Sequence, residues 1–233
     1  MCGFDFFVLM TQARIILEFL KDLAANNDRE WFAENKPRYN EALEALNGIV
    51  DRLIAGLGLF DDAIKYLHAK DCTYRIYRDI RFSPDKSPYK RHMAAYIARG
   101  GRKSIRPGYY FHLQPGGESL LAGGLYCEDS KMVKAARRAI NDNQEEFLEI
   151  VGERSFKENF VFAGDRLKRM PLGFEQDSLV AEYLKYKDFT IMCKLSDTFF
   201  DEDGWEEKAV ALFEKMKPYN DFMNAALDDY YNV

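Results

Sequence analysis

Hydrophobic residues recur at helical spacing in the N-terminal part of the chain. Apolar positions between residues 13 and 25 fall on one face of a helix and predict that this face is buried. A short helix should begin at Asp28, after an asparagine placed to cap it. Pro37 suits the first turn of a third helix, which should end at Gly56 and Gly58.

The period changes from helical to alternating in the middle of the chain. Alternation of apolar and polar residues, bounded by turns rich in Pro, Gly and Asp, predicts strands. The expected strands cover residues 74–82, 92–99, 108–114 and 120–127, with a fifth at 189–195. Short connections favour antiparallel pairing. Gly123 and Gly124, inside a strand, indicate a bulge or a close approach of the backbone to another group.

Helical spacing returns in the remainder of the chain. We expect one helix over residues 129–151, a short one over 178–184, and a long one over 203–231. Pro218 should break or kink the last of these, because proline removes a backbone donor and clashes with the preceding turn. The acidic residues of this tail are expected to pair with basic residues elsewhere.

This order of elements predicts an α+β fold, with helices at the ends of the chain and strands in its middle. We expect a single domain over residues 1–233, in which N-terminal, central and C-terminal helices flank a central antiparallel sheet of four to five strands. A length of 233 residues with 47% hydrophobic content is enough for one large core. Residues 1–10 are expected to be extended or disordered, and Met10 is an alternative start.

The four cysteines are scattered, with no Cys-x-x-Cys pair. Free thiols in a reducing compartment fit this pattern better than disulfides or a zinc site, so we expect a cytoplasmic protein. The positions are Cys2, Cys72, Cys127 and Cys193. The apolar opening lacks a basic segment and is too short to cross a bilayer, so no membrane partner is expected.

Positive charge is concentrated in one stretch of an acidic chain. Residues 75–106 contain ten Lys and Arg against two Asp, a charge of +8 in a chain of net charge −5, which leaves −13 for the remainder. Such a block focuses potential on one surface, and small anions or phosphates are its natural ligands. A solvated face is the ordinary interpretation of a charge run, but here the charges alternate with apolar residues of an expected strand.

The expected strand over 74–82 has two chemically different faces. Arg78 shares a face with isoleucines, so its guanidinium requires a carboxylate partner or a bound anion. Arg75, Asp79 and Arg81 share the other face with Tyr77. Asp79 then either belongs to a structural ion-pair ladder or orients the arginines toward a ligand.

A proline-punctuated turn follows this strand. Pro84 and Pro88 stiffen the chain and favour consecutive turns. Lys86 and Tyr89 are then presented from a rigid loop, in which Asp85 caps the turn or holds the lysine. Donors on such a loop, next to arginines on a strand, suggest an anion clamp.

The same residues form the pattern Arg-x-x-Arg-Asp-x-Arg-Phe-x-x-x-Asp-Lys-x-x-Tyr. Its members are Arg75, Arg78, Asp79, Arg81, Phe82, Asp85, Lys86 and Tyr89. The pattern resembles the signature of the bacterial conserved-hypothetical family called domain of unknown function 2461. Residues 27–36, 108–113 and 167–174 resemble that family as well, so the resemblance covers nearly the whole chain. It implies no reaction, because the family has no established activity to carry over.

Candidate chemistry beyond this motif is sparse. The three histidines have no metal-ligand spacing, although His92 and His112 lie on neighbouring expected strands and can meet. No nucleophile elbow or nucleotide-binding glycine motif is present, and the sequence leaves the question of a cofactor open. If the protein is an enzyme, Asp79 is the best acid–base candidate. Neighbouring arginines should lower its pKa, which favours a base or orienting role over a general acid.

Three classes of function remain open from the sequence. The first is a pocket that binds a phosphorylated or carboxylated small molecule, either as an enzyme or without catalysis. Its ligand-binding residues would be Arg75, Arg78, Arg81, Asp85, Lys86 and Tyr89. The second is a nucleic-acid-binding module, which a pI near 5.4 disfavours without excluding it. The third is a structural protein whose motif is an internal ion-pair network. Salt dependence of binding or of stability separates these classes.

Overall fold

The computed structural model describes residues 11–126 and 129–231, and its chain starts with three consecutive helices. These are α1 (Gln12–Ala25), α2 (Arg29–Glu34) and α3 (Lys36–Leu57). The side chain of Thr11 caps α1 and that of Asp28 caps α2, each by accepting a backbone N–H three residues on. Pro37 lies in the first turn of α3, as the sequence predicts.

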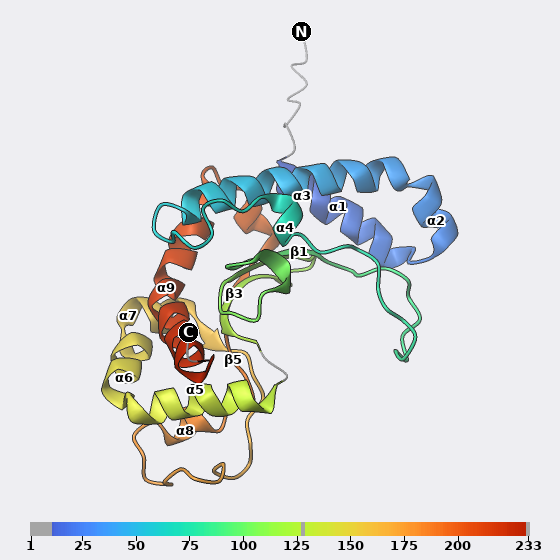
Figure 1. Ribbon diagram of the computed structural model, residues 1–233. Coiled ribbons are helices and arrows are strands. Elements are labelled where there is room, and N and C mark those ends of the chain that lie inside the picture. Colours follow the sequence, from blue (N-terminus) through green and yellow to red (C-terminus); the bar gives the residue numbers. More distant parts are fainter. Residues whose placement is uncertain (1–10, 127–128, 232–233) are drawn as a thin grey trace.

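The centre of the fold is an antiparallel sheet with strand order β1–β2–β3–β5–β4 (Figure 1). The strands are β1 (Met93–Ile97), β2 (Tyr109–Leu113), β3 (Ser119–Leu125), β4 (Val161–Phe162) and β5 (Phe189–Leu195). The prediction of an α+β domain with four to five antiparallel strands is confirmed. Four of the expected strands correspond to β1, β2, β3 and β5, whereas the two residues of β4 are too few to leave an alternating pattern.

The remaining elements correct two expectations about helices. They are α4 (Ala69–Cys72), η1 (Gly101–Lys103), α5 (Ser130–Asp142), α6 (Gln144–Gly152), α7 (Arg154–Asn159), α8 (Ala181–Leu184), η2 (Asp197–Asp201) and α9 (Trp205–Tyr231). The single helix expected over 129–151 is wrong, because Asn143 separates α5 from α6. Its side-chain amide donates to the carbonyl of Ala139 at 3.0 Å, which competes with continued helix.

Pro218 was expected to break or kink the last helix, and the break is wrong, since α9 continues through it. Phe213 and Met216 before the proline, and Tyr219 and Met223 after it, are all fully buried. Burial of large apolar side chains on both sides of Pro218 outweighs the loss of one helical hydrogen bond.

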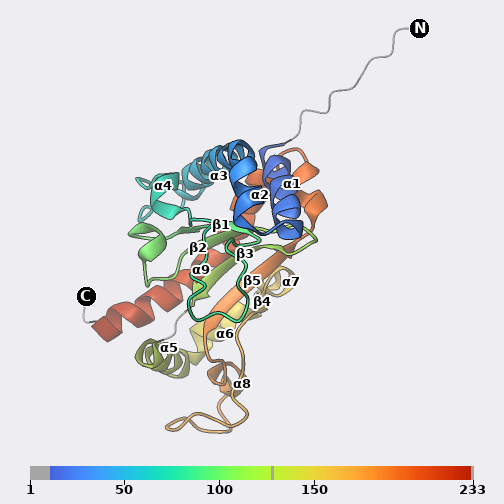
Figure 2. The same cartoon turned by 90° about the vertical axis from the view of Figure 1, so that its right-hand side faces the viewer.

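Helices cover one side of the curved sheet and leave the other side open (Figures 1 and 2). α1, α3 and α9 lie on the convex side, where the side chains of Phe111, Leu121 and Ile191 are fully buried. α9 is fastened to the sheet by Asn220, which accepts the N–H of Gly124 at 2.6 Å and donates to the carbonyl of Gly108 at 3.0 Å. The functional question therefore concerns the concave side.

The strand expected over 74–82 is wrong. Residues 74–92 instead form a narrow projection that leaves the sheet and returns to it, which we call the arm (Figure 1). Ile76 is buried, but Phe82, expected on the same half-buried face, is 94% exposed. The alternating pattern has no partner strand beyond the first residues of the arm, because Pro84 and Pro88 turn the chain back on itself.

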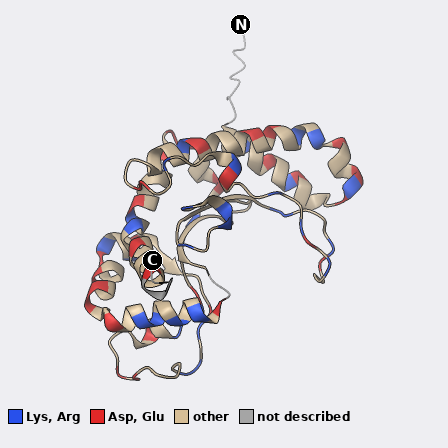
Figure 3. Cartoon of the chain, in the orientation of Figure 1, with Lys and Arg blue, Asp and Glu red and all other residues tan. Residues whose placement is uncertain are grey.

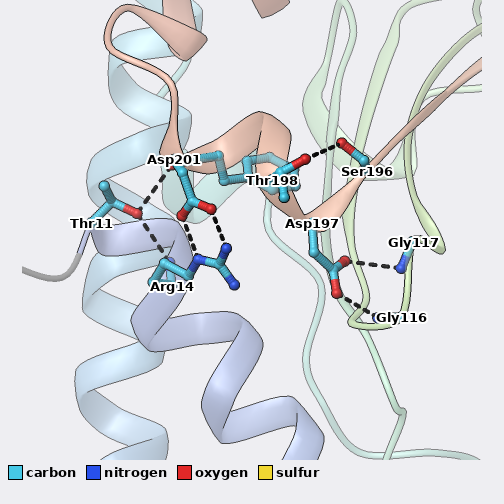
Figure 4. Close-up of polar contacts among 9 residues, drawn as sticks. Thr11, Arg14, Gly116, Gly117, Ser196, Asp197, Thr198 and Asp201 are labelled. Carbon is cyan, nitrogen blue, oxygen red and sulfur yellow. Dashed lines mark hydrogen bonds and ion pairs between the residues drawn. The ribbon is translucent and has the colours of Figure 1, made fainter.

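A polar cluster joins α1, η2 and the β2–β3 turn (Figure 4). Asp197 accepts the N–H of Gly116 at 2.8 Å and that of Gly117 at 2.9 Å. Both glycines have positive φ, so the turn presents its amides together, and the carboxylate satisfies them. At the other end of η2, Arg14 donates two hydrogen bonds to Asp201.

We expect Asp197→Ala to lower the free energy of unfolding by about 1–2 kcal/mol, because two amides lose a charged acceptor but regain water. Urea denaturation of the full chain measures this loss. Asp203→Ala is the matched control, since Asp203 is exposed in the same segment and should change stability by less than about 0.5 kcal/mol. Equal losses for the two variants would contradict the assigned role of Asp197.

Several sequence-based expectations concern the ends of the chain and the cysteines. The extension at residues 1–10, the alternative start at Met10, and both Cys2 and Cys127 lie outside the described residues. Cys72 and Cys193 are free thiols. The acidic tail does supply partners for basic residues, because Glu206 pairs with Arg52 at 2.6 Å and Asp228 pairs with Arg106 at 2.5 Å.

Candidate functional site

The arm carries every candidate residue of the sequence motif. Its foot consists of residues 74–78 and 88–92, which run antiparallel, and its tip consists of residues 79–87. Two backbone hydrogen bonds join the strands of the foot, one from Arg78 to Pro88 at 3.0 Å and one from Lys90 to Ile76 at 2.8 Å. Figure 3 shows how Lys and Arg follow the arm.

The foot is held against α2. The side-chain amide of Asn27 donates to the carbonyl of Tyr89 at 3.0 Å, and its oxygen accepts the N–H of the same residue at 3.1 Å. The buried ring of Tyr89 stacks on Phe32, with centroids 4.0 Å apart. Tyr77 packs against both rings and is 43% exposed. Tyr89 therefore positions the arm, and its ring belongs to the core.

Arg78 organises the turn of the tip. Its guanidinium pairs with Asp85 at 2.6 Å and donates to the carbonyl of Ser87 and the hydroxyl of Ser83, each at 3.2 Å. The carboxylate partner required by the sequence argument is present, and it comes from the arm itself. Hydrogen bonds from Ser87, together with Arg78, hold the pKa of Asp85 well below its usual range.

Asp79, Arg81 and Lys86 lie on the exposed part of the tip. Arg81 donates to Asp79 from two nitrogens, at 2.9 and 2.6 Å. This pairing lowers the pKa of Asp79, the direction expected from the sequence. Lys86 donates to the carbonyl of Ile80 at 3.0 Å. The structure thus brings the tip residues together in pairs, and whether they bind a ligand stays a prediction.

A cavity of about 540 Å³ lies on the concave side of the sheet, next to the foot of the arm. It is lined by Tyr74, Lys90, His92, Tyr96, Ser104, Ile105, Tyr110, Leu120, Ala122, Gly123, Gly124, Tyr126, Ala163, Asp188, Thr190 and Met192. Lys90 and His92 come from the returning side of the foot. A cavity of this size suits a small molecule.

Strand register builds the floor of the cavity. Tyr96, Tyr110, Ala122 and Met192 are successive partners across β1, β2, β3 and β5. They alternate along their strands with the core residues of the convex side, so their side chains face the concave side. The small side chain of Ala122, between a tyrosine and a methionine, leaves space above the middle of the sheet.

Two tyrosines of the cavity donate hydrogen bonds to backbone carbonyls. Tyr74 donates to the carbonyl of Arg102 at 3.2 Å, and Tyr96 donates to that of Arg106 at 2.5 Å. Burial raises the pKa of Tyr96 and of Tyr110 well above the usual range. Both therefore stay neutral and present aromatic surface to the cavity.

His92 and His112 stack on each other beside the cavity, with ring centroids 4.3 Å apart. Nε2 of His112 lies 3.3 Å from Oε1 of Gln114, and its Nδ1 lies 3.0 Å from the hydroxyl of Tyr110. A carboxamide oxygen only accepts, so Nε2 carries the proton and Nδ1 accepts from the tyrosine. Burial, the nearby His112 and Lys90 lower the pKa of His92 to about 4, so both imidazoles are neutral near pH 7.

Lys90 is the lysine of the cavity wall. Its ammonium lies 5.3 Å from the centre of the Tyr74 ring. No ion pair joins Lys90 or Arg75 to an acidic residue within residues 11–126 and 129–231. Burial, with the charge of Arg75 nearby, lowers the pKa of Lys90.

Sequence reasoning placed the site along the motif and missed most of this cavity. Lys90 follows the motif directly, but its position in a wall depends on the fold of the arm. One signal in the sequence could have indicated the cavity. On the face of β2 that points away from the core, Tyr110 and His112 occupy alternate positions, where a face in contact with solvent would carry charged residues.

Two further findings concern metal sites and membrane helices. Within the part of the chain that the structure describes, no group of three or more His, Cys, Asp or Glu side chains is placed to hold a metal ion. None of the described helices is long and apolar enough to cross a membrane.

Comparison with known proteins gives one match. The model of a conserved hypothetical protein family, DUF2461, matches residues 15–222, which include the arm, the whole sheet and most of α9. No curated protein and no solved structure matches the chain.

Proposed function

The chain belongs to the conserved hypothetical protein family DUF2461, and we propose that it binds a small phosphorylated or carboxylated molecule in the cavity on the concave side of its sheet. The observation that carries the proposal is the position of Lys90. This residue places a cation in the wall of a cavity large enough for a small ligand, with no described acidic partner to neutralise it.

Charge at the foot of the arm supports an anionic ligand. Arg75 is exposed and is not among the lining residues, but its positive charge acts on Lys90 in the cavity wall. Such a pair is unfavourable without an anion, and a phosphate or carboxylate relieves the repulsion through charge-assisted hydrogen bonds. Asp188 is the acidic residue among the lining side chains, and its carboxylate accepts the N–H of Thr190 at 3.1 Å.

The lining also supports a ligand with an apolar or planar body. Tyr74, Tyr96, Tyr110 and Tyr126 contribute rings to the cavity, and Leu120 and Met192 contribute aliphatic surface. Pockets for small molecules combine such surface with a few polar groups that fix orientation. We therefore favour an organic anion over inorganic phosphate alone.

The tip residues support the rival proposal of a structural ion-pair network. Arg78 is bound by Asp85, and Arg81 by Asp79, so these guanidiniums already have acceptors. A ligand reaches them only by displacing these carboxylates. In our proposal Arg75 contacts the ligand, while Arg78 and Asp85 shape the tip and Tyr89 fixes the foot. Lys86 then contributes long-range positive charge, while Arg81 stays paired with Asp79.

We expect an organic phosphate such as pyridoxine 5′-phosphate to stabilise the wild-type chain at low salt. At a hundredfold excess over Kd the melting temperature should rise by about 5–10 °C for a chain of this size. Thermal shift and calorimetry measure this, with phosphate, simple carboxylates, nucleotides and short oligonucleotides as comparison ligands. The shift should shrink as salt is added.

Three variants locate the site. Lys90→Met should abolish the shift, whereas Lys21→Met, on the exposed surface of α1, should retain it. Arg81→Ala should reduce it only slightly, because Arg81 lies at the tip. Loss of binding in Arg81→Ala with retention in Lys90→Met would move the site to the tip and overturn the cavity proposal. No stabilisation by any anion would leave the ion-pair network as the function of the motif, and a preference for oligonucleotides would support a nucleic-acid module.

A further inference from the structure

Lys90 has an environment that differs from that of an ordinary surface lysine. It is partly buried in the cavity wall, and its ammonium faces the ring of Tyr74. Arg75, on the other side of the foot, is the charged residue that influences it, and Asp188, which lines the same cavity, forms no ion pair with it in the described part of the chain. His92, two residues away, is neutral at pH 7.

Partial burial and the charge of Arg75 make it easier for Lys90 to lose a proton than for an exposed lysine, whereas the Tyr74 ring attracts the ammonium, so Lys90 is a cation that can also react as the amine. Removal from water and a nearby positive charge both penalise the protonated form, and they explain why the pKa of Lys90 is lowered. A lysine that is desolvated, or next to another cation, is the type that enzymes use as an amine nucleophile toward carbonyl groups. Tyr74, Tyr96 and Tyr110 face the cavity in neutral form and supply no negative charge to restore the ammonium.

We infer that Lys90 is a nucleophile that captures an aldehyde or ketone group of the bound anion as an imine. This inference rests on the proposed function, because it takes the ligand to be an organic phosphate or carboxylate in the same cavity. It adds a substrate class, namely a carbonyl compound that carries an anionic group.

The step balances without any further reactant. The nitrogen lone pair of Lys90 attacks the carbonyl carbon, a C–N bond forms, and the carbonyl electron pair moves to oxygen, which takes up a proton. A second proton converts that hydroxyl to water, which leaves as the C=N bond forms. The nitrogen gives up one of its two N–H protons and the solvent supplies the other proton, so one amine, one carbonyl and one proton give one protonated imine and one water, with no net oxidation or reduction. The protonated imine keeps a positive charge at this edge of the cavity, so the anion retains its partner.

Borohydride trapping tests the inference on the full chain. Pyridoxal 5′-phosphate, an aromatic aldehyde with a phosphate, is added at low concentration, the imine is reduced with borohydride, and the modified lysines are mapped by peptide mass spectrometry. We expect Lys90 to be labelled several-fold faster than Lys86, which is exposed on the same arm. Excess pyridoxine 5′-phosphate, which has the phosphate but an alcohol in place of the aldehyde, should suppress labelling of Lys90 and leave Lys86 unchanged. Pyridoxal, which lacks the phosphate, should label Lys90 more slowly.

Variants separate this inference from the proposed function. Lys90→Arg keeps the positive charge but forms no imine, so it should still be stabilised by pyridoxine 5′-phosphate while site-specific labelling disappears. Lys86→Arg should behave as wild type in both assays. If pyridoxine 5′-phosphate binds the wild type but labelling is spread over exposed lysines, the inference of an imine at Lys90 is overturned and the proposal of anion binding stands. Absence of stabilisation by pyridoxine 5′-phosphate and by every other anion of the thermal-shift series overturns the proposed function itself.

Discussion

Replacing Gly124 by alanine is expected to destabilise the protein by about 4 kcal/mol or more, which is enough to unfold many domains. Gly124 has φ +82°, where an L side chain is strained by about 1–2 kcal/mol. A Cβ there would also lie 2.2 Å from the carbonyl oxygen of Phe189 and 2.7 Å from the ring of Tyr219. Neither group can move easily, because Phe189 belongs to β5 and Tyr219 is fully buried and donates to that same carbonyl at 3.0 Å.

Gly173→Ala is the matched control for this prediction. Gly173 has a similar φ, +89°, but a Cβ at that position meets nothing within 4 Å. It should therefore show only the backbone term, about 1–2 kcal/mol. Urea denaturation and the yield of folded protein measure both variants. If Gly124→Ala lowers the free energy of unfolding no more than Gly173→Ala does, β3 and α9 can separate at no cost in free energy. That result would contradict the close packing described above.

This glycine illustrates what the sequence predicts well. A Gly-Gly pair inside an alternating run indicates close approach of the backbone, and the structure identifies the approaching groups as β5 and α9. The four strands that form hairpins or pair along their whole length were also predictable, because alternation and turn residues act over a few neighbouring positions.

The arm shows where this local signal fails. Residues 75–82 alternate as well as a strand does, yet the only bridge in this stretch joins Tyr77 to Tyr89. Alternation indicates a strand only when a partner strand exists to bury one face, and the prolines prevent such a partner from continuing. Phe82 is consequently exposed, although its spacing from Ile76 suggests burial.

The positive charge of the candidate site could be predicted from the sequence, but the position of the site in the fold could not. The cationic block draws attention to residues near 75–91, and whether they bind an anion stays a prediction. The partners of each cation depend on the turn geometry of the tip, which pairs Arg78 with Asp85 and leaves Lys90 to the cavity. The cavity itself is assembled from the arm, β1, β2, β3 and β5, and no pattern within a single segment brings these together.

The stacked histidines lead to the second large effect, a loss of stability in mild acid. The pKa of His92 is about 4 in the folded protein, below the ordinary value near 6.5, because burial and the neighbouring His112 and Lys90 disfavour the imidazolium. Between these values the unfolded chain binds a proton that the folded chain does not. The stabilising contribution is therefore fully present above about pH 6.5 and is lost as the pH falls toward 4.

A difference of this size corresponds to about 3 kcal/mol for His92, and His112, whose pKa is also lowered, acts in the same direction. Urea denaturation at several pH values between about 7.5 and 4.5 measures the slope. His92→Phe keeps a ring against His112 but removes the titrating group, so most of the slope should vanish, whereas His68→Phe, at an exposed position, should retain it.

Paired carboxylates such as Asp85, whose pKa is lowered, lose their contribution at still lower pH and cannot produce the same profile. An unchanged slope in His92→Phe would show that the imidazole is already hydrated or charged in the folded protein, and the dry, uncharged wall beside Lys90 would then be wrong.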